Sequence, residues 1–353
     1  MDIKILPAMH GDCILISFGE GKNRKNILID GGVSRTYRLY LKDELIKIKS
    51  KGEYIDLLII THIDDDHIAG ICRWFEDDEF DKSIIKKVWF NSKRNICRHF
   101  NSDVKEVENT VQLNVNLSNK KSVKQGIYLE DKLSELNTWV KEVIFEEYKD
   151  EIGECKIRVL SPDLKGLEKL NNKWEIEESK NTKKARAVDY KYLIEELILR
   201  EDVEDKSVPN ESSIAVLMEY RESNILLLGD AKASVVVKAL NRIGYNESNK
   251  LNLNLLKVAH HGSKNNISEE LLKIIECKNY VISTDSQMHG LPDKECLSKI
   301  IVSNREVNLY FNYNYILKKK VFTQEEYEKF NFKCNILRED ESCYIEGGIY
   351  LWR

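Results

Sequence analysis

The sequence has little of what marks linkers, membrane spans or secretion signals. Its 353 residues include only 4 prolines and 16 glycines, which gives no flexible stretch at which to divide the chain. No apolar run is long enough to span a membrane, and the N-terminus lacks the apolar segment of a signal peptide. We therefore expect one domain over residues 1–353 that works in the cytoplasm without contacting a membrane.

Cysteine usage and net charge exclude further classes of protein. The 8 cysteines form no Cys-x-x-Cys pair, which argues against a zinc ribbon or a dithiol redox centre. A formal net charge of −4 argues against non-specific coating of nucleic acid, because such binding depends on phosphate neutralisation by Lys and Arg. A local basic groove stays compatible with this charge.

Apolar and turn-forming residues alternate in a way that predicts a mixed α/β fold. The chain is 42% hydrophobic, enough for a large core. Short apolar runs predict strands at 3–7, 13–18, 26–30, 55–61, 87–91, 156–161, 213–220, 224–228, 253–259 and 280–284. Helical patterns cover 37–48, 67–75, 129–148, 233–243 and 269–276. Polar, charge-rich stretches predict insertions near 95–126 and 163–205, the second mostly helical, and a C-terminal extension near 305–353.

The segment from Thr61 to His67, with the sequence Thr-His-Ile-Asp-Asp-Asp-His, follows an apolar strand. In an extended segment, residues two apart point the same way, so His62 and Asp64 can share one metal. Asp66 and His67 begin the following helix and are placed to reach a second metal. Carboxylate and imidazole ligands together suit Zn²⁺, Mn²⁺ or Fe. The alternative interpretation of this segment is a solvated acidic loop that binds no metal.

Two later strands also end in polar clusters. Asp230 follows the run 226–229 and could bridge two metals, although an acid there can equally cap a helix. The pair His260 and His261 follows the run 257–259, and one member is expected to bind a metal while the other lies behind it. Ligands at strand ends are typical of layered α/β proteins, because the scaffold holds them rigidly.

Taken in order, five motifs resemble the metallo-β-lactamase superfamily, and more narrowly the branch typified by the hydrolase domain of the competence protein ComEC. In that branch Asp replaces the second His of His-x-His-x-Asp-His, as Asp64 does here. The resemblance implies a four-layer αβ/βα sandwich with two divalent metal ions, Zn or Mn, at the sheet edges. The motifs are His10-Gly11-Asp12-Cys13, Ile29-Asp30-Gly31-Gly32, the segment 61–67, Leu228-Gly229-Asp230 and His260-His261-Gly262-Ser263.

The resemblance also implies roles for individual residues. Asp30 corresponds to an acid that supports the metal loop, and Asp12 lies in the first motif. Asn210 and Ser212 belong to a segment that resembles the branch's Asn-Asp-x-Ser. No His between Cys97 and Asn210 matches the superfamily's middle His, so we expect the first metal to be weakly held or completed by water or substrate. The implied ligands are His62, Asp64, Asp66, His67, Asp230 and one of His260 and His261.

Two metals can bridge a water, lower its pKa and stabilise the attacking and leaving oxygens of a hydrolytic reaction. We therefore expect a metal-dependent hydrolase in which Asp66 is catalytic. The ComEC-like pattern favours a phosphodiesterase or nuclease acting on DNA or RNA, with His289 holding a phosphate oxygen or protonating the leaving group. The alternatives are hydrolysis of a small phosphorylcholine-type ester, thioester or lactam, and an inactive metal-stabilised binding module. Basic clusters that could guide a phosphate backbone occur at 86–98, 183–186 and 318–320.

Overall fold

Strand residues alternate between two apolar cores, and this alternation sets the layers of the computed structural model. In one strand, Ile14 and Ile16 enter the core between two sheets, whereas Leu15 enters the core beneath the helices. Ile225 and Leu226 divide in the same way in the second sheet. Because successive side chains of a strand point to opposite faces, each sheet is buried on both sides. The structure describes residues 1–101, 121–173 and 188–353.

The first sheet has seven strands in the order β16-β17-β1-β2-β3-β4-β5. Strands β3, β4 and β5 run parallel, and β1, β2 and β3 pair antiparallel. Its strands are β1 (Asp2–Ile5), β2 (Ile14–Phe18), β3 (Lys25–Ile29), β4 (Leu57–Ile60), β5 (Val88–Phe90), β16 (Cys343–Ile345) and β17 (Ile349–Trp352).

The second sheet has eight strands in the order β15-β14-β13-β11-β9-β8-β7-β6. Strands β9, β11, β13, β14 and β15 run parallel. Its strands are β6 (Lys149–Ile152), β7 (Cys155–Ser161), β8 (Ala215–Tyr220), β9 (Ser223–Leu227), β11 (Leu255–Lys257), β13 (Asn279–Ile282), β14 (Asn308–Phe311) and β15 (Lys333–Ile336), and a separate pair joins β10 (Leu251–Leu253) to β12 (Ile275–Cys277).

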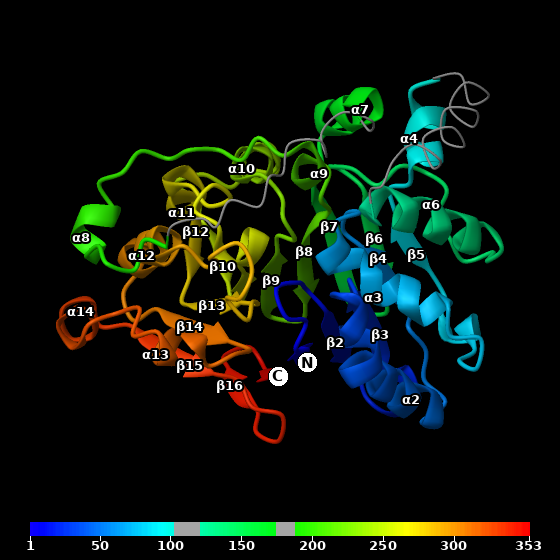
Figure 1. Ribbon diagram of the computed structural model, residues 1–353, viewed down its shortest axis with the longest axis horizontal. Helices are drawn as coiled ribbons and strands as arrows, with labels where there is room; N and C mark the ends of the chain where they lie inside the picture. Colours follow the sequence, from blue (N-terminus) through cyan, green and yellow to red (C-terminus); the bar gives the residue numbers. More distant parts are fainter. Residues whose placement is uncertain (102–120, 174–187) are drawn as a thin grey trace.

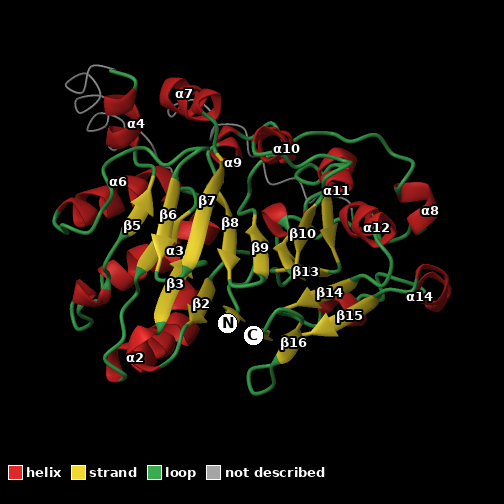
Figure 2. Ribbon diagram, turned by 180° about the vertical axis from the view of Figure 1, so that it is seen from behind, coloured by secondary structure: helices red, strands yellow, loops and turns green. Residues whose placement is uncertain are grey.

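Helices lie outside the two sheets, which gives the expected four-layer αβ/βα sandwich (Figures 1 and 2). Helices α2 and α3 cover the first sheet, and α10, α11 and α12 cover the second. The helices are α1 (Ser34–Thr36), a π-helical turn (Tyr37–Leu41), α2 (Lys42–Ser50), α3 (Asp65–Phe75), α4 (Lys93–His99), α6 (Lys121–Ser134), α7 (Leu164–Lys173), α8 (Ile194–Leu197), α9 (Val208–Glu211), α10 (Ala233–Arg242), α11 (Glu269–Ile274), α12 (Lys294–Ser303), α13 (Tyr315–Lys318) and α14 (Gln324–Phe330).

Most predicted elements are confirmed, but the helix predicted over 129–148 is wrong. Helix α6 ends at Ser134, and the apolar residues that follow pack as an extended segment against β5. The Val140 amide donates to the Val88 carbonyl at 3.0 Å, and the Ile144 amide donates to Asn91 Oδ1 at 2.8 Å. The strand predicted over 253–259 is two strands, β10 and β11, which enter different sheets.

The predicted insertions contain regular structure. The stretch 95–126 includes part of α4 and the start of α6, and residues 102–120 lie outside the described part of the chain. The stretch 163–205 contains α7 and α8 around residues 174–187, which also lie outside the described part, and 198–206 is irregular. The segment expected as a C-terminal extension supplies strands β14 to β17 to the two sheets. Within the described residues, no helix is long and apolar enough to cross a membrane.

Candidate metal centre

The polar clusters predicted at strand ends meet at one edge of the sandwich. Asp30 follows β3 and Thr61 follows β4 in the first sheet, while Asp230 follows β9 and His260 follows β11 in the second. The Ile214 amide donates to the Thr61 carbonyl at 3.0 Å and joins the two sheets there. Because parallel strands end at the same edge, residues more than 150 positions apart in sequence come together.

The loop that carries the first motif is held tightly against the N-terminal loop. Asp64 precedes α3 in an extended conformation, and Asp66 and His67 lie in its first turn. A Cβ added to Gly11 would lie 1.8 Å from the Asp66 carbonyl oxygen, so only glycine permits this approach. The Asp12 amide donates to that same carbonyl at 3.2 Å. The two loops therefore form one rigid wall of the site.

Asp230 lies between the imidazoles of the first motif. Its Oδ2 is 3.7 Å from Nε2 of His62, and its Oδ1 is 3.4 Å from Nε2 of His67. The Asp64 carboxylate lies 3.7 Å from the same Nε2 of His62. On the other side of the site, Nε2 of His261 is 3.2 Å from Oδ2 of Asp66.

Several of these ligand-type atoms are buried and lack a hydrogen-bond partner among the described residues. They are Nε2 of His62, His67 and His261, and Oδ1 of Asp230. Buried polar atoms normally have partners, so an unpaired group of this kind needs another explanation. Two ligands about 2.0–2.2 Å from one metal ion lie roughly 3–4 Å apart, which is the spacing observed here. The donor set therefore fits divalent cations.

In each of these three imidazoles, Nδ1 faces a hydrogen-bond acceptor, and this contact keeps the ring proton on Nδ1. His67 Nδ1 lies 2.8 Å from Oδ2 of Asp30, and His261 Nδ1 lies 3.0 Å from the Ser283 carbonyl. His62 Nδ1 lies 3.0 Å from Oγ1 of Thr61, whose hydroxyl donates to Asp30. All three acceptors require a proton on Nδ1, which leaves the Nε2 lone pair for a metal.

The electrostatics of the centre are those of an anionic site with buried imidazoles. Burial, reinforced by the nearby His67, lowers the pKa of His62 to about 4. Burial also acts to lower the pKa of His67 and His261, but Asp230 and other carboxylates outweigh it, and the pKa of His261 rises to about 9. Burial and neighbouring carboxylates raise the pKa of Asp64 to about 7. Divalent cations would replace the protons that this cluster otherwise shares.

The supporting residues take different positions. Asp30 accepts from the Thr61 amide at 2.8 Å and orients His67, which agrees with a role in holding the metal loop. Asp12 pairs with the buried Lys257 and faces the His261 ring. Ser212 donates to the Pro209 carbonyl and faces its own turn. Its neighbour Ser213 is the one that accepts from the Asp230 amide, and its Oγ lies 3.4 Å from Nδ1 of His62.

His289 is exposed and lies beside His10, near enough to Asp66 for its charge to act on His289, and we call the position of these two histidines the mouth of the site. The two rings are 6.4 Å apart in an edge-to-face arrangement, and neither makes a hydrogen bond within the described residues. Partial desolvation lowers the pKa of His289 against the opposing effect of Asp66. His10 belongs to the first motif, but nothing in the sequence indicates that it lies near His289.

Three residues of the centre have no clear signal in the sequence. Lys257 ends a buried apolar strand, which is its only unusual feature. Asp205 lies 3.5 Å from His260 Nδ1, and Asn266 contacts both residues. Asp205 sits in a charge-rich stretch that does not distinguish it from the neighbouring acids.

The basic clusters of the described residues lie in different parts of the fold. Lys86 pairs with Asp56 and Lys87 pairs with Asp150, at the start of β5 and therefore at the edge opposite the metal centre. Arg94 lies on α4 and pairs with Asp131. Lys318 to Lys320 lie at the end of α13, and residues 183–186 lie outside the described part of the chain.

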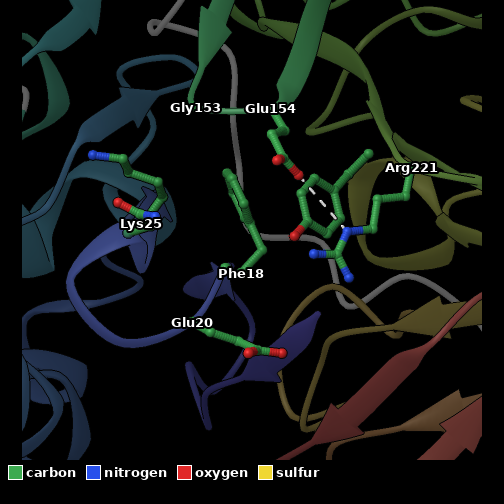
Figure 3. Close-up of a pocket in the computed structure, with 9 residues that line it drawn as sticks. Phe18, Glu20, Lys25, Gly153, Glu154 and Arg221 are labelled. Carbon is green, nitrogen blue, oxygen red and sulfur yellow. Dashed lines mark ion pairs between the residues drawn. The ribbon is translucent and has the colours of Figure 1, made fainter.

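A cavity of about 340 Å³ opens at the edge opposite the metal centre. Figure 3 shows Phe18, Lys25 and Gly153 around it, with Glu154 and Arg221 joined by an ion pair of 3.7 Å. Its lining contains no His, and its two acids, Glu20 and Glu154, are exposed. The cavity therefore lacks the buried imidazole and carboxylate ligands that the metal centre has.

Comparison with known proteins gives one family match over part of the chain and solved structures of low similarity. A model of the metallo-beta-lactamase superfamily matches residues 6–90, which include the first three motifs. The chain resembles the metallo-beta-lactamase fold protein YhfI from Bacillus subtilis with 10% identity and a TM-score of 0.40, covering 97% of this chain and 98% of that one. It resembles an E377D mutant of CmlA beta-hydroxylase with 10% identity and a TM-score of 0.40, covering 92% of this chain and 50% of that one. No curated protein matches the sequence. The family match and the two facing sheets with outer helices show that the chain has the metallo-β-lactamase fold.

Proposed function

We propose that the protein is a dinuclear metal-dependent hydrolase of phosphodiesters, acting as a phosphodiesterase or nuclease. The observation that carries the proposal is the convergence of unpartnered buried atoms from His62, His67, His261 and Asp230. Four buried ligand atoms without hydrogen-bond partners, together with imidazoles whose Nδ1 atoms face acceptors, are what metal ligation would explain.

The residues of the centre would have different roles in such a site. Asp30 and Ser283 orient the imidazoles of His67 and His261, and the Asp66 carboxylate faces His261. Bound divalent cations would supply an activated water and neutralise charge on the substrate. Asp230 presents one oxygen to His62 and the other to His67, which suits a carboxylate shared by two ions.

The preference for phosphodiesters rests on the ComEC-like motif and on the mouth of the site. Asp64 adds a carboxylate where the wider superfamily has His, and hard oxygen ligands suit ions used in phosphoryl chemistry. His10 and His289 offer two imidazoles that are not hydrogen-bonded within the described residues and that can donate to non-bridging phosphate oxygens. In this proposal His289 also protonates the leaving alkoxide.

The test is an assay of purified protein loaded with Zn²⁺ or Mn²⁺ against bis(p-nitrophenyl) phosphate, single- and double-stranded DNA, and RNA. The matched control is the Asp66→Ala variant prepared in parallel, which excludes a contaminating nuclease. Cleavage of a nucleic acid supports a nuclease, and cleavage of the chromogenic diester alone supports a small-substrate phosphodiesterase. Turnover of a thioester or lactam only, or two bound ions with no turnover, would contradict the proposal.

A further inference from the structure

The second oxygen of Asp230 faces two imidazoles, and one of them belongs to His260. Nε2 of His260 lies 3.8 Å from Oδ2 of Asp230, and Nε2 of His62 lies 3.7 Å from that same oxygen. The other oxygen faces His67. The imidazoles therefore divide into two groups around the carboxylate, and His260 falls in the group of His62.

The tautomer of His260 that suits metal binding is favoured by Asn266. Nδ2 of Asn266 donates to the carbonyls of Asp230 and Ala231 at 3.0 and 3.4 Å, which fixes the orientation of the amide. Its Oδ1 then lies 3.0 Å from Nδ1 of His260 and can only accept a hydrogen bond from that nitrogen. The amide nitrogen of Asn210 is farther from the same Nδ1, at 3.2 Å, and donates to Asp205 at 2.6 Å. The proton on Nδ1 leaves the Nε2 lone pair directed at the carboxylate of Asp230.

Asp205 strengthens this arrangement from behind the ring. Its Oδ2 lies 3.5 Å from His260 Nδ1 and accepts from Nδ2 of Asn210 at 2.6 Å. Its Oδ1 accepts from the Ser207 amide at 2.9 Å. A carboxylate held by several donors behind a ring nitrogen is the arrangement that orients metal-binding imidazoles.

The backbone allows two neighbouring side chains to reach one site. His260 has φ 45° and ψ 52°, and His261 has φ 54° and ψ 25°, so both residues are left-handed. Their rings lie 5.9 Å apart at an interplanar angle of 74°. In an extended chain the two side chains would point in opposite directions.

The remaining histidines do not offer a ligand in this position. His99, the only His between Cys97 and Asn210, lies on α4 with its ring against Phe100 and Phe145. His10 and His289 pair with each other at the mouth of the site.

From these contacts we infer that His260 and His261 bind different metal ions, and that His260 replaces the missing middle His. His260 completes the first site with His62, Asp64 and Asp230, while His261 belongs to the second site with Asp66 and His67. Asp205 is a positioning residue for His260. The inference rests on the proposed dinuclear centre and concerns which residues build it.

The experiment measures metal content and affinity. Wild type, His260→Ala and His260→Asn are loaded with Mn²⁺ or Zn²⁺, freed of excess ion and analysed for ions per chain. We expect two ions in the wild type and one in both variants, with folding checked by circular dichroism. Electron paramagnetic resonance of the Mn²⁺ proteins should show spin coupling in the wild type and isolated ions in the variants. Two tightly bound, coupled ions in the His260 variants would overturn the inference.

Asp205→Asn tests the positioning role, with the exposed neighbour Glu204 changed to Gln as the control. Loss of a partner behind a ligand weakens metal binding by roughly 10–100-fold, and we expect this for one ion only. Asp205→Glu, which keeps the carboxylate, should restore part of that affinity. Equal affinities in Asp205→Asn and Glu204→Gln would refute the role of Asp205. A wild type that binds no metal would instead refute the proposed function.

Discussion

A buried ion pair connects the two sheets beneath the metal centre, and breaking it should destabilise the protein measurably. Lys257 at the end of β11 contacts Asp12 in the N-terminal loop, and their side chains are 1% and 2% exposed. The change Lys257→Met removes the cation, fills most of its volume and leaves the Asp12 carboxylate buried without that partner. Removing one member of a buried pair costs about 3–5 kcal/mol where the remaining charge is uncompensated. His261 Nδ1 lies 3.6 Å from Oδ1 of Asp12 and compensates part of that charge, so this range is the largest loss expected here.

The expected shift in melting temperature follows from the size of the chain. Unfolding entropy is about 2.1 cal/mol/K per residue, or about 0.7 kcal/mol/K for 353 residues, so the largest expected fall in Tm is about 4–7 °C. The stability lost in Lys257→Met should depend on pH. Lys257 holds the pKa of Asp12 below its ordinary value against the effect of burial, so the stabilisation is complete above the unfolded pKa near 3.8 and disappears as the pH falls.

The assay is differential scanning calorimetry of metal-free protein at pH 7 and at acidic pH. Lys294→Met provides a matched comparison, because Lys294 is equally buried and pairs with Glu326, which is also buried. The double variant Lys257→Met with Asp12→Asn should recover part of the lost stability, since no unpaired charge remains. A Lys257→Met protein within about 1 °C of the wild type, alongside a destabilised Lys294→Met, would refute the reasoning.

The remaining predictions concern the centre itself. Asp66→Ala and His67→Ala should abolish hydrolysis while circular dichroism stays unchanged, and wild-type turnover in either would exclude it as a ligand. Asp230→Asn should reduce kcat/KM by more than the roughly 10–100-fold expected for an outer partner, because an amide cannot bridge two cations; normal rate with two bound ions would contradict this. His261 should release a proton when metal binds at pH 7.5, because its metal-free pKa is raised to about 9. Calorimetry in buffers of different ionisation enthalpy measures the number of protons released, and a value of zero would contradict metal binding by His261. His289→Ala should lower kcat by roughly 10²–10⁴-fold with both ions bound, whereas an unchanged rate with a lower Tm would make His289 structural.

The sequence predicts much of the fold because local pattern and tertiary structure agree in most strands. The apolar runs before Asp30, Thr61 and Asp230 are buried on both faces, and such runs can hardly be anything but central strands. The helix predicted over 129–148 is wrong for the opposite reason. Its second half has apolar residues that suit a helix, but β5 offers Trp139 and Ile144 an extended partner, and long-range hydrogen bonds outweigh helix propensity.

The site shows where sequence reasoning stops. The ligand types around His62 and Asp66 can be predicted because their spacing is local and set by one strand and one helix. The role that we infer for His260 cannot be predicted in this way, because an extended backbone would send adjacent side chains in opposite directions and leave only one of the pair at the site. The left-handed backbone of both residues, and the amide of Asn266 behind the first ring, arise only when β9 and β11 lie side by side. Single left-handed residues other than glycine cost about 1–3 kcal/mol and persist where the surroundings enforce them. Two in succession, both histidine, with the first ring facing Asp230 and the second facing Asp66, are therefore what two ligands from one turn require.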